Sequence, residues 1–281
     1  MDNIKEYIES YVAFGKAIPY NGLKIRPILV KDFYQFRDAQ NVLKIDKNKI
    51  PDIEIIQMTY LRFLMLLMVE HKELVEDFLI IMSLCLGATY RRELRNTDFE
   101  PNELLTQQIR KDEYQIIING WNVGFRVCDN QTWLQLYTDG DMVEINDNQF
   151  NDLKSIILFQ NIYEYDDMEM SDDFRRVVEE YYAIKNKDII IPTLEDRMMA
   201  VAISSSYKLE ELYELPLRLF DALFEYSVEK LEYQVNKLIV NLAQGEIKGF
   251  KLSHWVYKTK KDKYSEIFTD AQELVKKVTS I

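Results

Sequence analysis

The side chains best suited to metal or acid–base chemistry are four closely spaced aspartates, Asp166, Asp167, Asp172 and Asp173. Carboxylates this close in sequence can bind a hard cation, and paired carboxylates can share general acid and base roles. The surrounding residues 161–180 hold eight acids against two arginines, Arg175 and Arg176, which is a local net charge of −6. We interpret the stretch Asp166–Asp173 as part of a solvated acidic linker, and a metal-dependent enzyme is the alternative hypothesis.

Other catalytic and cofactor-binding patterns are missing from the sequence. The two histidines, His71 and His254, have no cysteine nearby, so an ordinary zinc site is not predicted. The eight glycines are isolated and form no phosphate-binding loop. The segment Asp139-Gly140-Asp141 is typical of a hairpin turn rather than of a calcium loop. The sequence therefore predicts no catalytic residue, no cofactor and no metal site, and a protein that is not an enzyme.

A basic segment near the end of the sequence is the candidate site for docking a partner. Residues Lys248–Lys263 carry six lysines and one acid, a local net charge of +5, whereas the whole chain has a formal net charge of −12. Lysines interleaved with aromatic rings can hold single-stranded nucleic acid. Because the chain is acidic and the segment has no arginine, we favour docking of an acidic protein or a solvated face, with a nucleic-acid-binding regulator as the alternative. The candidate docking residues are Lys248, Lys251, His254, Trp255, Tyr257 and Lys258.

Composition is typical of a globular protein, with 47% apolar and 29% charged residues. The most apolar stretch, Leu61–Val69, is far shorter than the roughly 20 residues that span a bilayer. Residues 1–10 lack the basic and apolar regions of a signal peptide. Cys85 lies in an apolar run and is expected to be buried, and no disulfide framework is predicted. We therefore expect a soluble, cytoplasmic protein with no membrane partner.

Helical periodicity dominates the first part of the chain. Residues 2–14 have the spacing of an amphipathic helix, and Asn21-Gly22 is a strong signal for the turn of a hairpin within 18–30. We expect the helices of 31–87 to be one over 31–43, a longer one opened by Pro51, and a third over 72–86 that ends at Gly87. The last two are apolar on nearly all sides and should form the buried centre, with Met65 and Met68 in the core.

The next part of the chain changes to strand-like sequence. Residues 113–145 predict a small antiparallel sheet of three or four strands, followed by a helix over 148–160 that Asn146 or Asp147 caps. Thr193 should cap another helix, Pro216 should open a long helix to about Ala243, and 261–278 resembles a terminal amphipathic helix.

The predicted fold class is α+β and predominantly helical, with a small sheet of hairpins, a helical N-terminal insertion and a helical C-terminal lobe. The predicted domains are an α+β domain over 1–165 and a helical domain over 166–281.

Several segments spread over most of the chain together resemble one group of known proteins. These segments are Ile18–Phe33, Lys47–Asp52, Met58–Leu64, Trp133–Leu136, Asn148–Asn161, Leu194–Asp196, Gly245–Lys248 and His254-Trp255. They resemble tail and baseplate proteins of tailed bacteriophages, and the layout is similar to tail-assembly chaperones or T4-type baseplate hub assembly proteins.

The resemblance carries no active-site residues and implies a function by protein–protein contact. It implies phage tail, tape-measure or baseplate proteins as partners, with a homo-oligomer as a further expectation. It also implies a location in the host cytoplasm during phage assembly, and in the virion if the protein stays in the particle. It leaves open whether the protein is an assembly chaperone or a structural component.

Overall fold

The computed structural model describes residues 2–91, 105–110, 113–128, 131–137, 141–163, 165, 180 and 192–242. The fold is α+β and mostly helical, with two small antiparallel sheets, as the sequence predicts. The chain divides into two compact units. The first consists of Met1–Asp166 with Glu210–Asp221, and the second of Asp167–Leu209 with Ala222–Ile281. Among the described helices, none is long and apolar enough to cross a membrane.

The first unit begins with helix α1 (Asp2–Ala13) and a short hairpin of β1 (Ile18–Tyr20) and β2 (Leu23–Ile25). Its turn residues Asn21 and Gly22 have φ angles of +46° and +80°. Positive φ at both central residues is what a tight primed turn requires, so the predicted Asn-Gly turn is confirmed.

The helices that follow include two that carry much of the core of this unit. Helix α5 runs over the predicted residues and ends at Gly87 in the left-handed conformation, with φ +73°. Met65 and Met68 of α4 are buried, as the sequence predicts. The elements of this region are η1 (Val30–Asp32), α2 (Phe33–Ala39), η2 (Gln40–Leu43), η3 (Lys47–Lys49), α3 (Ile53–Gln57), α4 (Tyr60–Glu70) and α5 (Lys72–Leu86).

The single long helix predicted from Pro51 is wrong, because the chain breaks into α3 and α4 at Met58 and Thr59. Both residues have extended backbone, with ψ of 148° and 153°. The ammonium of Lys47 donates hydrogen bonds to the carbonyls of Ile56 and Met58, at 2.6 and 2.5 Å. A lysine that satisfies these carbonyls replaces the bonds that a continuous helix would have made. The helical spacing on either side of the break gave no sign of it.

The main sheet has five described strands in the order β3-β4-β5-β6-β7, all antiparallel. The sequence predicted three or four strands, and β3 was missed because its residues, LTQQIR, give no clear alternation of apolar and polar side chains. The strands are β3 (Leu105–Arg110), β4 (Glu113–Ile118), β5 (Val123–Cys128), β6 (Gln131–Tyr137) and β7 (Met142–Asn146).

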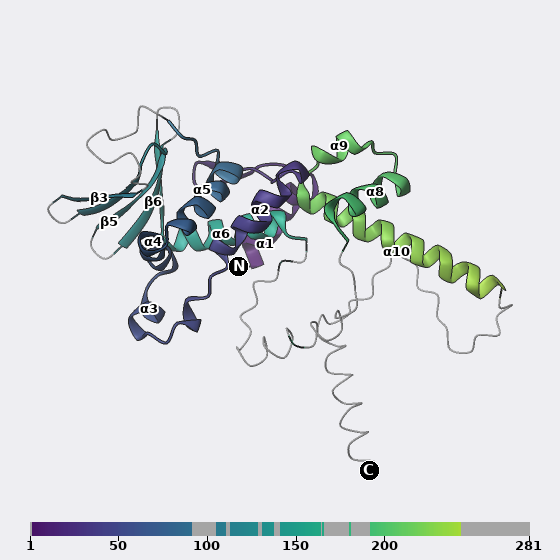
Figure 1. Cartoon of the computed structure of the whole chain (residues 1–281), viewed down its shortest axis with the longest axis horizontal. Helices are drawn as coiled ribbons and strands as arrows, with labels where there is room; N and C mark the ends of the chain where they lie inside the picture. The colour runs from purple at the N-terminus through teal and green to yellow at the C-terminus, as the bar shows by residue number, and fades with distance from the viewer. Residues whose placement is uncertain are drawn as a thin grey trace, which may run out of the picture. The chain divides into compact units, whose positions relative to one another are not determined.

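Helix α6 (Asp147–Asn161) follows β7 and starts with a capping box. The side chain of Asn146 accepts from the N–H of Gln149, whose own side chain accepts from the N–H of Asn146. The described helices α4, α5 and α6 lie on one side of the sheet (Figure 1), and α4 and α6 both contact β6. Phe78 of α5 packs on Phe125 of β5 with ring centroids 5.5 Å apart, and both rings are fully buried.

The segment Glu210–Asp221 is tied to the first unit by backbone and side-chain hydrogen bonds. The N–H of Val30 donates to the carbonyl of Leu215, and the N–H of Leu217 donates to the carbonyl of Ile28. Arg218 donates from Nη1 to the carbonyl of Ile162, at 2.7 Å, near the C-terminus of α6.

The remaining described helices are α8 (Leu194–Ser204), α9 (Leu209–Tyr213) and α10 (Leu217–Leu242). Thr193 caps α8 in a capping box with Asp196, and α10 begins directly after Pro216, both as predicted.

Candidate functional site: the outer face of the sheet

Most residues that the sequence offered for chemistry or docking lie outside the described part of the structure. This holds for the docking residues Lys248, Lys251, His254, Trp255, Tyr257 and Lys258, for the acids Asp166, Asp167, Asp172 and Asp173, and for the turn residues Asp139 and Gly140. His71 is described. It lies exposed between α4 and α5, with Nδ1 3.4 Å from a carboxylate oxygen of Glu73.

The surface with the richest side-chain chemistry among the described residues is the face of the sheet that points away from α4, α5 and α6. Successive side chains of a strand alternate between the two faces, and the register of β4 to β7 decides which residues share this one. We call it the outer sheet face, and its described residues are Gln115, Ile117, Gly124, Arg126, Cys128, Gln131, Trp133, Gln135, Tyr137, Met142 and Glu144.

An ion pair lies in the middle of the outer sheet face. Arg126 donates from Nε and Nη2 to the two carboxylate oxygens of Glu144, both at 3.0 Å, which is a bidentate arrangement. Gln135 of the strand between them donates to the same carboxylate at 2.9 Å. The guanidinium of Arg126 also lies over the ring of Trp133, with 4.4 Å between its central carbon and the ring centroid. The side chains of three neighbouring strands are therefore held in one network.

The protonation state of Glu144 is set by this network. Burial by itself raises the pKa of the carboxyl, but the hydrogen bonds from Gln135 and Arg126, together with the charge of Arg126, outweigh burial and lower it. Glu144 is thus ionised at neutral pH. Because the pair is bidentate and its arginine lies on an aromatic ring, the groups of the network have little freedom to rearrange.

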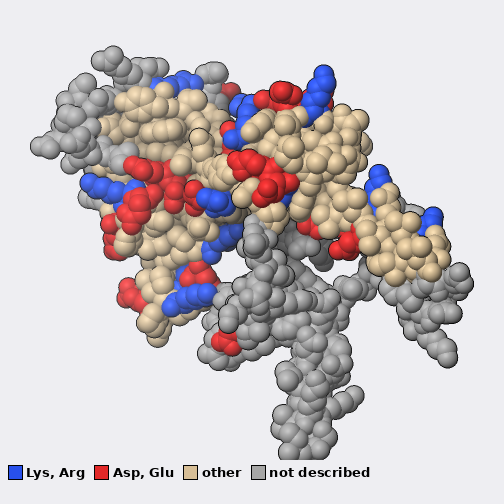
Figure 2. Space-filling view, turned by 45° about the vertical axis from the view of Figure 1, so that its right-hand side comes forward, with Lys and Arg blue, Asp and Glu red and all other residues tan. Residues whose placement is uncertain are grey.

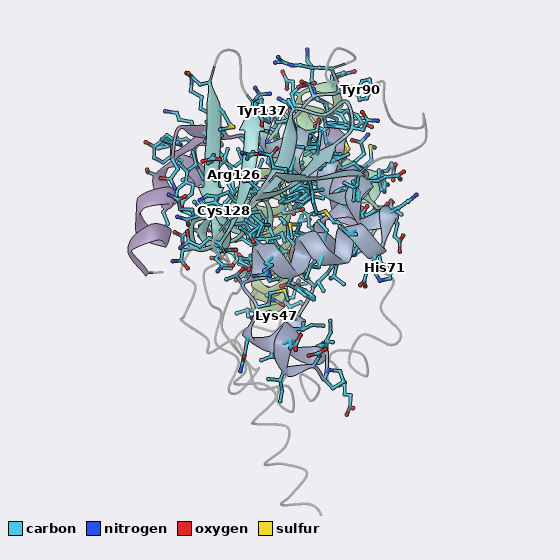
Figure 3. The ribbon with its side chains drawn as sticks, turned by 90° about the vertical axis from the view of Figure 1, so that its left-hand side faces the viewer. Lys47, His71, Tyr90, Arg126, Cys128 and Tyr137 are labelled. Carbon is cyan, nitrogen blue, oxygen red and sulfur yellow. The ribbon has the colours of Figure 1, made fainter. Side chains whose placement is uncertain are left out.

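Apolar side chains border the network on the outer sheet face. Tyr137 and Met142, which face each other across β6 and β7, are 43% and 48% exposed, and Trp133 is half-buried. Figure 3 looks onto the sheet and shows Tyr137, Arg126 and Cys128 on its strands. The backbone of Tyr137 is fixed by Asn122. Its carbonyl accepts from Asn122 Nδ2 at 2.7 Å, and its N–H donates to the carbonyl of Asn122 at 2.8 Å.

A pocket of about 350 Å³ opens between α2, α5 and the turn that joins β4 to β5. Its lining is mostly apolar, with Gln35, Glu76 and Ser83 as polar members, and Trp121 comes from the turn. Tyr90 packs edge-on against Trp121 with ring centroids 6.2 Å apart. Gly120 permits this contact, because its φ is +81° and a Cβ there would overlap the ring of Tyr90.

Groups suited to metal binding or nucleophilic chemistry are scarce in the described ranges. No three His, Cys, Asp or Glu side chains in these ranges lie close enough together to hold a metal ion. The thiol of Cys85 is fully buried, as the sequence predicts, and burial raises its pKa to about 12. A thiol with that pKa is protonated at neutral pH and is a poor nucleophile. Cys128, on the outer sheet face, is half-buried.

Comparisons with known proteins give no relative from which a site could be transferred. No protein-family model, no curated protein and no solved structure matches the chain.

The sequence contained the residues of the outer sheet face but not their grouping. Two sets of these residues follow the period of two of a strand, so the sequence could have placed each set on one face. The sets are Arg126 with Cys128, and Trp133 with Gln135 and Tyr137. The pairing of the strands was needed to bring the two sets together.

Proposed function

We propose that this protein acts without catalysis, by protein–protein contacts in the assembly of a bacteriophage tail or baseplate, as an assembly chaperone or a structural component. The observation that carries the proposal is the aromatic, methionine- and arginine-containing outer sheet face. The phage context is supported by the resemblance of the sequence segments to tail and baseplate proteins.

The composition of the outer sheet face favours a protein partner. An antiparallel sheet with helices on one side usually presents polar side chains to water on the other. Here Ile117, Trp133, Tyr137 and Met142 share that face with the ion pair. Trp, Tyr, Met and Arg are the residue types that are enriched at protein interfaces. Figure 2 turns the left-hand side of Figure 1 away from the viewer; on the side that it presents, charged side chains gather in patches with uncharged areas between them.

The rigidity of the face also favours binding. The side chain of Arg126 is held by Glu144 and Trp133, and the backbone of Tyr137 is held by Asn122. A surface whose side chains are already ordered loses less conformational entropy when a partner binds. Tyr137 and Met142 are the large apolar members of the face that are exposed, and we assign them the main contact with the partner.

The proposal is tested by co-expressing the tagged protein with the tail, tape-measure and baseplate proteins of a tailed phage, one at a time. We expect a stable complex with one of them, and at least about tenfold weaker binding after Tyr137→Ala with Met142→Ala, as for the loss of central interface residues. The matched control is Ile53→Ala on α3, a residue that is 71% exposed and distant from the sheet in sequence. The control should bind like the wild type.

Two results would contradict the proposal. Failure to bind any of these phage proteins would remove the phage-assembly function. A complex that forms equally well with the double variant would remove the outer sheet face as the contact surface.

A further inference from the structure

Helix α10 carries an apolar stripe that is exposed among the described residues. Near its start, Leu217 and Phe220 are buried. From Leu231 onward the apolar side chains on the same side of the helix are between 44% and 82% exposed. Such a stripe is normally buried against another surface, because its exposure to water is unfavourable.

The spacing of the stripe is that of a coiled coil. Its members alternate between intervals of four and three residues, which is the a/d pattern of a heptad repeat. The d positions are Phe224, Leu231 and Leu238, and the a positions are Val228, Val235 and Leu242.

The residue types at these positions point to a particular partner. Valine fills the a positions 228 and 235, and leucine fills the d positions 231 and 238. A β-branched residue at a with leucine at d favours two parallel strands. The pattern therefore suits a second helix with the same sequence, in parallel and in register.

The charges beside the stripe are compatible with this arrangement. In a parallel pair each g position faces the e position five residues later on the partner helix. This brings Ser227 next to Glu232 and Gln234 next to Ile239, so no like charges meet. An antiparallel pair with the same a/d layers would put Glu232 opposite Glu232 of the second copy. Residues 224–242 hold three glutamates and two lysines, a net charge of −1, so repulsion between two copies is small here although the whole chain carries −12.

We infer that α10 joins two copies of this protein through a parallel two-stranded coiled coil over residues 224–242. The coil is about 28 Å long at 1.5 Å per residue, which is less than three full heptads. In proteins most of the stability of a helix comes from packing of its apolar face rather than from intrinsic propensity. The buried residues Leu217 and Phe220 fix the start of α10, so the helix is formed before the second copy binds. The dimer has twofold symmetry, and its inference is independent of the proposed function.

Sedimentation velocity of the full-length protein from about 1 to about 100 µM tests the dimer. We expect the mass to rise from the monomer value of 33.5 kDa towards twice that value. Leu238→Glu, at an exposed d position, should keep the mass at that of the monomer throughout. The matched control Val240→Glu, at an f position away from the stripe, should dimerise like the wild type. Circular dichroism of both variants checks that the helices are retained.

The orientation is tested with Leu242→Cys in a Cys128→Ser background. In the parallel dimer the two new thiols lie together at an a layer, and mild oxidation should link the chains. In an antiparallel dimer they lie at opposite ends of the coil and do not link.

A monomeric wild type at the highest concentration would overturn the inference, as would a Leu238→Glu variant that still dimerises. A dimer whose residue 242 thiols do not link would overturn the parallel arrangement. A mass of three or more copies would overturn the two-stranded one.

Discussion

Asn161 connects the end of α6 to the segment before η1, and its replacement by alanine should destabilise the first unit strongly. The side chain is almost fully buried. Its Oδ1 accepts from the N–H of Ile28 at 2.7 Å, and its Nδ2 donates to the carbonyl of Ile157 at 2.8 Å. Ile28 is itself buried, and its carbonyl accepts from the N–H of Leu217. The amide thus holds the segment on which Glu210–Asp221 is docked.

The size of the effect follows from these two bonds. Asn161→Ala leaves the buried N–H of Ile28 without its acceptor, which costs about 1–3 kcal/mol. Loss of the hydrogen bond to the carbonyl of Ile157 adds about 0.5–1.5 kcal/mol. We take the lower part of this range, because a carbonyl within a helix can also accept from a backbone N–H. We therefore expect the free energy of unfolding to fall by about 2–4 kcal/mol.

Urea unfolding followed by tryptophan fluorescence measures this change. With Trp255→Phe as background, the signal comes from Trp121 and Trp133, which both lie in the first unit. A loss of about 2–4 kcal/mol shifts the urea midpoint down by about 1–2 M. The control is Asn41→Ala, at an exposed position, which should change the stability by less than about 0.5 kcal/mol. If Asn161→Ala behaves like this control, Asn161 does not hold Ile28 in the way we describe.

Three further changes test the core, the thiols and the ion pair. Phe78→Ala should lower the free energy of unfolding by about 3–5 kcal/mol, because it leaves a cavity beside Phe125. A smaller loss in urea unfolding would mean that the two rings do not pack in the core. In the native protein at pH 8 a thiol reagent should label Cys128 much faster than Cys85, and a Cys128→Ser variant that still reacts quickly would contradict the burial of Cys85. Glu144→Gln should be less stable than the wild type at pH 7. Because the folded-state pKa of Glu144 is lowered from 4.5, the stabilisation by its carboxylate is present above that pH and is lost as the pH falls below it. The difference in stability between the variant and the wild type should therefore narrow as the pH falls below 4.5, and a difference independent of pH would refute the role of the carboxylate.

The two surfaces that we propose as contact sites were not predicted from the sequence. The outer sheet face requires the register of four strands, which no local signal in residues 113–145 defines. The heptads of residues 224–242 could have been read from the sequence, since the intervals of three and four residues are local. The exposure of these side chains could not have been read from the sequence, because it depends on which other elements pack against α10.

The elements that the sequence predicted well are those with strong local signals. Helix α5 combines continuous apolar periodicity with a terminal Gly87, and the hairpin turn needs only Asn21 and Gly22. Capping at Asn146 and Thr193 is also local, because the bonds are made within three residues. The break between α3 and α4 was missed, because Lys47, which satisfies the carbonyls at the break, lies 9 and 11 residues away from them.

By itself the sequence determined the α+β, mostly helical class, the burial of Cys85, Met65 and Met68, and the start of α10 after Pro216. Apolar spacing, caps and turn residues act within a few residues, so they can be recognised without knowing the fold. Only the tertiary structure decided that Arg126, Trp133 and Glu144 form one network, that β3 joins the sheet, and that Asn161 holds Ile28. The physical reason is that the contacts of the network and of Asn161 join residues between 7 and 133 positions apart, and that strand register and helix packing decide which strands and side chains meet.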